Sequence, residues 1–65
     1  MTSDEVRARL DALRAIAGDD EAAHAEEDNL RADVLGAIQA GAPNPQQLAW
    51  LALKTSDIEF ERWCA

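Results

Sequence analysis

The chain has 65 residues, 13 of them acidic and six basic, which gives a formal net charge of −7. This length allows a single small helical domain over 1–65 and excludes a multi-domain enzyme. Such a domain buries only about 60 % of the surface that its unfolded chain exposes, so the core should be thin. Because Cys64 is the only cysteine, no disulfide can form within the chain, and extra stability would have to come from a partner or a second copy.

The first predicted helix covers about 3–17. Thr2 and Glu5 have the spacing of a capping box at its start. Apolar residues then recur at three- and four-residue steps, which predicts one buried stripe made of Val6, Leu10, Leu13, Ile16 and Ala17. Gly18 is expected to end this helix in the left-handed conformation.

The second predicted helix covers about 20–40 and begins at the acidic run Asp19–Glu21, which supplies an N-cap and negative first-turn charge. Its second half carries a stripe of Leu30, Val34, Ala37 and Ile38. Its first two turns offer only alanines and Glu on that face, so we expect them to project beyond the core. A single long helix through Gly18 is the alternative, but it would extend the first stripe onto polar residues.

Gly41–Pro43 stops the second helix, and Asn44 with Pro45 predicts a third helix over about 45–53, apolar nearly all round. Ser56 and Glu59 form a second possible capping box, which predicts a fourth helix over about 57–64. The predicted fold is therefore all-α, a compact bundle of three to four helices.

Acidic residues concentrate near the start of the second predicted helix. Residues 1–33 have a net charge of −6, against −1 for 34–65, and six acids fall within 19–28. This surface would repel nucleic-acid phosphates and anionic membranes. It is either a solvated helix start or a binding surface for a basic partner. The candidate binding residues in the acidic run are Asp20, Glu26, Glu27 and Asp28.

Three large apolar residues are further candidates for a partner surface. Leu35 lies away from the Leu30–Val34–Ile38 stripe, and Trp50 lies away from the main face of the third helix. Trp63 belongs to the aromatic C-terminal region. Burying Leu35 and Trp50 against a second subunit would offset the thin core, so a homodimer is expected.

Three other functions have weaker motifs. Glu21 and His24 form a single E-x-x-H, which supplies too few ligands for a metal centre unless a dimer contributes a second copy. The third and fourth predicted helices have helix-turn-helix spacing, but the second helix would present mostly acids to DNA. No catalytic motif is present, so we predict no enzyme activity, no metal site and no cofactor.

The stretches 37–45, 48–49, 52–55 and 57–63 resemble small uncharacterised proteins of actinobacteria and their bacteriophages. The resemblance covers about half of the chain, and it implies a phage accessory protein that binds a host protein. Residues 1–20 lack the apolar region of a signal peptide, so a cytoplasmic location is expected. The sequence therefore predicts a small acidic protein–protein interaction module, with a DNA-binding regulator and a metal-binding helical dimer as alternatives.

Overall fold

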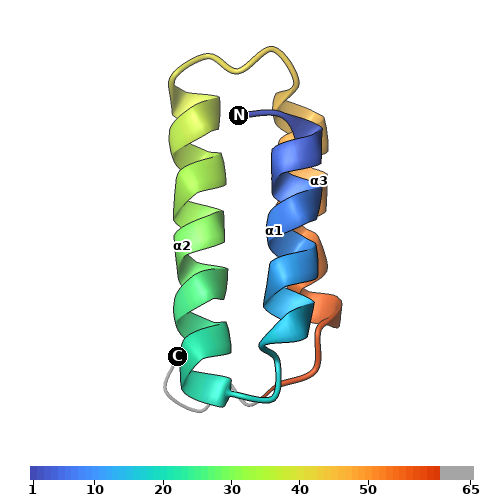
Figure 1. Cartoon of the computed structure of the whole chain (residues 1–65). Helices are drawn as coiled ribbons and strands as arrows, with labels where there is room; N and C mark the ends of the chain where they lie inside the picture. Colours follow the sequence, from blue (N-terminus) through green and yellow to red (C-terminus); the bar gives the residue numbers. More distant parts are fainter. Residues whose placement is uncertain (61–65) are drawn as a thin grey trace.

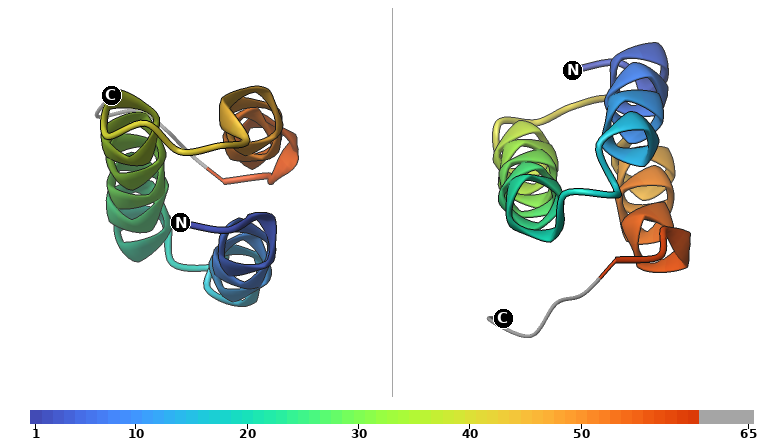
Figure 2. Two further views of the ribbon diagram at one scale, coloured as in Figure 1. Left: turned by 90° about the horizontal axis from the view of Figure 1, so that it is seen from above. Right: turned by 60° about the horizontal axis from the view of Figure 1, so that its bottom comes forward.

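The computed structural model of the chain describes residues 1–60, which form a three-helix bundle. Its elements are α1 (Ser3–Ala15), α2 (Asp20–Gln39), α3 (Pro45–Leu53) and the short 3-10 helix η1 (Lys54–Asp57). No strand occurs within residues 1–60. α2 runs antiparallel to α1 and α3, which lie on the same side of it (Figure 1; Figure 2). The predicted all-α bundle is confirmed at this level.

Side chains cap the first two helices as the sequence predicts. The Glu5 amide donates to Thr2 Oγ1 at 3.2 Å, and the Thr2 amide donates to Glu5 Oε1 at 3.3 Å. At the start of α2, the Ala22 amide donates to Asp19 Oδ1 at 3.1 Å. These bonds satisfy backbone donors that have no partner inside their helices.

α2 ends in a Schellman motif centred on Gly41. Gly41 has φ 94°, and it is the one residue of 1–60 with a positive φ. Its amide donates to the Ile38 carbonyl at 3.0 Å, and the Ala42 amide donates to the Ala37 carbonyl at 3.1 Å. This left-handed position favours glycine and turns the chain back toward α3.

The end of α1 differs from the prediction at Gly18. The helix stops at Ala15, and Gly18 does not have a positive φ. The Ile16 and Ala17 amides donate to carbonyls three residues earlier, so the last turn tightens and needs no left-handed residue. The predicted break between α1 and α2 is confirmed, and the single long helix is excluded.

The predicted fourth helix is wrong over the described residues. η1 ends at Asp57, and residues 58–60 contain no helix. Ser56 does not cap a helix there: it lies within η1, and its hydroxyl accepts a hydrogen bond from Arg31 of α2. Ile58 adopts an extended backbone and enters the core. The rest of the predicted helix, including Trp63 and Cys64, lies outside the described residues.

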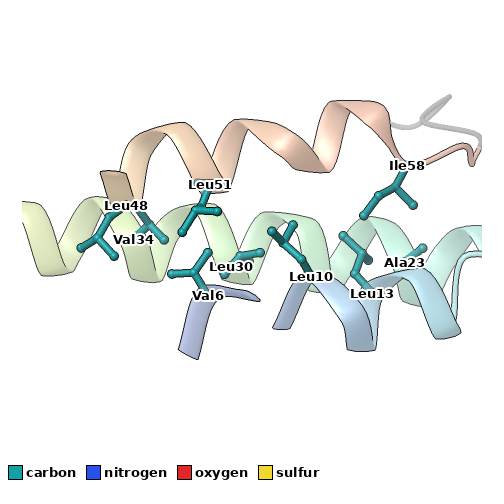
Figure 3. Packing of buried hydrophobic residues seen from close by; sticks show 10 residues of the cluster. Val6, Leu10, Leu13, Ala23, Leu30, Val34, Leu48, Leu51 and Ile58 are labelled. Carbon is teal, nitrogen blue, oxygen red and sulfur yellow. The ribbon is translucent and has the colours of Figure 1, made fainter. Parts of the chain in front are cut away.

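All three helices and the segment after η1 contribute to one hydrophobic core, shown in Figure 3. Its buried apolar members are Val6, Leu10, Leu13, Ala23, Leu30, Val34, Leu48, Leu51, Ala52 and Ile58. Ala23, Leu13 and Ile58 lie at one end of the cluster (Figure 3). The prediction that the first two turns of α2 project beyond the core is therefore wrong, because Ala23 is fully buried there.

Two polar contacts join α1 to the other helices. Arg9 pairs with Asp33 across the α1–α2 contact. Asn44 takes the predicted N-cap position of α3, but its side chain makes no cap hydrogen bond. Instead, Asn44 Nδ2 donates to Ser3 Oγ at 3.2 Å, which links the starts of α3 and α1.

Candidate interaction surface

Charge is divided unevenly between two parts of the bundle. The segment 34–53 contains no acidic or basic residue, so all 13 acids and all six bases lie outside it. This segment forms the last six residues of α2, the connecting turn and the whole of α3. One part of a strongly charged molecule is consequently free of charge.

A groove of about 220 Å³ runs between α2 and α3, and all its lining residues except one belong to this uncharged part. Four of its residues are at i, i+3, i+4 and i+7 along α2, and three are at i, i+3 and i+4 along α3, so each helix contributes one face. We call this surface the α2–α3 face; its residues are Arg31, Val34, Leu35, Ile38, Ala49, Ala52 and Leu53. It is apolar apart from Arg31 at one end.

Two leucines form the exposed edges of the α2–α3 face, one from each helix. Leu35 on α2 is 67 % exposed, and Leu53 on α3 is 65 % exposed. Between them, Val34 and Ala52 are buried and form part of the floor. Single exposed leucines are ordinary, but two beside an apolar groove make a continuous patch of the kind that binds proteins.

Arg31 is held at the end of the groove by the segment after α3. Its guanidinium donates to Thr55 Oγ1 from Nε at 3.0 Å and from Nη2 at 2.7 Å. Nη2 also donates to Ser56 Oγ at 3.0 Å. These bonds orient the charge of Arg31 toward η1 and fix the position of η1 against α2.

A second groove, of about 370 Å³, lies between α1 and α3 and has a different character. Charged residues of α1 and Lys54 of η1 line it together with Trp50, whose ring centroid lies 4.0 Å from Lys54 Nζ. Arg14, another lining residue, pairs with Asp11 at 2.9 Å. Trp50 is 58 % exposed, as predicted, but it lines this charged groove and not the α2–α3 face.

The acidic candidates do not share one environment. Glu26 and Asp28 are exposed, and Asp20 is half-buried. Glu27 is only 3 % exposed, so the expectation that it forms part of an exposed acidic surface is wrong. Glu27 lies four residues after the buried Ala23, and this spacing places both side chains on the core-facing side of α2.

The E-x-x-H motif does not assemble a larger cluster. His24 Nε2 lies 3.5 Å from Asp28 Oδ2, one turn further along α2. Within residues 1–60, no group of three or more His, Cys, Asp or Glu side chains is placed to hold a metal ion. In the same part of the chain, none of the helices has the length and apolar character needed to span a membrane.

The sequence prediction included Leu35 but missed Leu53 as its counterpart. Counting charges along the chain would have revealed the uncharged segment 34–53, and Leu53 ends that segment on the helix opposite Leu35. Trp63 lies outside the described residues. Comparisons with protein-family models, curated proteins and solved structures found no match to this chain, so the candidate surface is defined by its own geometry.

Proposed function

We propose that this protein is a small helical protein-binding module that uses the α2–α3 face as its binding surface. The observation that carries the proposal is the pair of exposed leucines, Leu35 and Leu53, on opposite edges of one apolar groove. Both belong to well-formed helices, so a partner would meet a preorganised surface and little order would have to be gained on binding.

The energetics favour burial of this face. Covering a leucine side chain that is two-thirds exposed stabilises a complex by about 1 to 2 kcal/mol. The segment 34–53 has no charged residue, so covering it with a partner removes no charged group of this segment from water. Arg31 already directs its donors to Thr55 and Ser56, so its desolvation is partly compensated. A partner with an apolar surface is therefore the best fit.

In this proposal the acidic run keeps the protein soluble and guides its encounter with a partner. With Glu27 buried, its exposed acids are spread over the first half of α2, and Glu26 and Asp28 lie on that surface. Exposed charges of this kind contribute more to association rates than to the lifetime of a complex. Because Glu27 is buried, fewer acidic side chains of the run can contact a partner, which disfavours the run as the main contact surface.

The two alternative functions have less support. A helix-turn-helix needs a second helix starting near Asp57, and residues 57–60 contain no α-helix. A metal-binding dimer would depend on Glu21 and His24, and the described residues hold no group of three possible ligands within one chain. Neither alternative accounts for the exposed leucines.

Affinity capture from the source cell, followed by titration of each captured protein in purified form, tests the proposed function. Leu53→Glu should weaken binding, whereas Asp20→Asn with Glu26→Gln and Asp28→Asn should change mainly the association rate and its salt dependence. Binding that is lost in the neutralised variant but kept in Leu53→Glu would instead assign the partner surface to the acidic run.

A further inference from the structure

We infer that the occupant of the α2–α3 face is a second copy of this chain, related to the first by a twofold axis. The inference rests on the proposed function, because it names the partner of the same face. It is carried by the placement of charge, by the shape of the face and by the size of the domain.

Charge restricts how two copies can meet. Each copy has a net charge of −7, so most approaches bring like charges together. The segment 34–53 contributes no charge, and contact through it keeps the acidic half of each molecule away from the interface centre. A basic partner would meet no acidic side chain on this face, because the acidic run of this chain lies in the first half of α2. The face is apolar apart from Arg31 at one end, so it suits another mainly apolar surface, and its own copy presents one.

The shape of the face meets the requirement for twofold self-association. In such an interface the same patch must supply both the protrusions and the depressions, because each copy presents identical residues. Leu35 and Leu53 protrude at the edges, and the groove between them has small residues, Ala49 and Ala52, along α3. A leucine edge of one copy can thus pack into the groove of the other, as helices do when side-chain ridges enter grooves.

A second copy would also enlarge the apolar core of this small domain. Residues 1–60 bury ten apolar residues in one cluster, which is a small core for an independent fold. Pairing two α2–α3 hairpins would place four helices around a shared apolar seam, with α1 outside it. Ile38 and Ala49, which are half-buried in the single chain, would become part of this seam.

Sedimentation equilibrium of the full chain tests the inference, over about 1 to 500 µM, the range in which a small apolar interface dissociates. We expect a monomer–dimer equilibrium for the wild type. Leu53→Glu should raise the dissociation constant by at least ~100-fold, because the buried carboxylate occurs twice in a symmetric interface. Ala12→Glu is the matched control: Ala12 is exposed on α1, and the variant has the same net charge but should dimerise nearly as the wild type does.

The outcomes separate this inference from the proposed function. A wild type that is monomeric throughout overturns the second-copy inference alone, because a different protein can still occupy the face. A dimer that persists in both Leu35→Glu and Leu53→Glu overturns the inference that a second copy binds at this face. It also contradicts the proposal that the α2–α3 face is the binding surface. Circular dichroism of each variant establishes that the helices remain, which is expected because both leucines are exposed in the single chain.

Discussion

Arg31 and Thr55, 24 residues apart in the chain, are joined by two hydrogen bonds from one guanidinium to one hydroxyl. Thr55 is fully buried, so its hydroxyl has exchanged water for protein partners. Arg31 lies on α2 and Thr55 on η1, and the contact therefore fixes where the chain goes after α3. It also holds the Arg31 guanidinium at the end of the α2–α3 face through Nε and Nη2.

A double-mutant cycle measures this contact. Thr55→Val keeps the shape of the side chain but removes the acceptor, and we expect it to lower the free energy of unfolding by about 1 to 2 kcal/mol. Arg31→Ala should cost a similar amount, and the pair should show a coupling of ~1 kcal/mol in urea unfolding. Ser56→Ala, which removes the other hydroxyl partner of Arg31 at an exposed position, serves as the control. A coupling near zero would mean that the two side chains act independently in solution.

Glu27 and its neighbour Glu26 offer a matched test of burial. Glu27→Lys places a new charge inside the bundle and should lower the free energy of unfolding by about 3 kcal/mol or more. Glu26→Lys makes the same change of charge at an exposed position, and it should alter stability by no more than about 0.5 kcal/mol. Thermal unfolding of both variants gives the comparison. Equal effects would place Glu27 on the surface and contradict the packing described above.

Two glycines five residues apart should respond in opposite directions to alanine. Gly36 lies within α2, is exposed and has open space around an added Cβ, so Gly36→Ala should stabilise the fold by about 0.5 to 1 kcal/mol. Gly41 has a φ of 94°, where a side chain is strained, so Gly41→Ala should destabilise it by about 1 to 2 kcal/mol. Urea unfolding tests both. A neutral Gly41→Ala would show that α2 ends without the Schellman motif.

The salt dependence of self-association distinguishes an apolar contact from a charged one. If two copies meet through the uncharged segment 34–53, their remaining acids repel one another from outside the interface. Raising the ionic strength screens this repulsion, so the dimer dissociation constant should fall by about 3- to 10-fold between low and high salt. Sedimentation in sodium chloride at both concentrations measures it. A dissociation constant that rises with salt would indicate an interface built on opposite charges.

Local sequence signals predicted the helices well because their boundaries depend on neighbouring residues. Thr2 and Glu5 start α1, Asp19 caps α2, and Gly41 ends α2, each through contacts within a few positions. The predicted cap at Ser56 failed for the opposite reason. Ser56 lies within η1 and its hydroxyl has a partner 25 residues away, and no local pattern indicates so distant a contact.

The candidate site could be predicted only in part for a similar reason. The position of Leu35 off the core stripe follows from helical periodicity, and its exposure confirms that interpretation. The burial of Glu27 was not predicted because acidic side chains are usually exposed, although its spacing from Ala23 and Leu30 places it on the core-facing side of α2. Leu53 becomes an edge of the α2–α3 face only when α3 packs antiparallel to α2.

The most direct test of the α2–α3 face is the accessibility of its leucine methyl groups to a dissolved paramagnetic probe, measured by NMR. Spectra of the wild type at about 1 mM and about 10 µM would compare associated and dissociated chains. We predict that the methyl groups of Leu35 and Leu53 are shielded at the higher concentration and accessible at the lower one, while the amides of Glu26 and Asp28 remain accessible at both. Shielding of the two acidic residues with unchanged leucines would contradict the account.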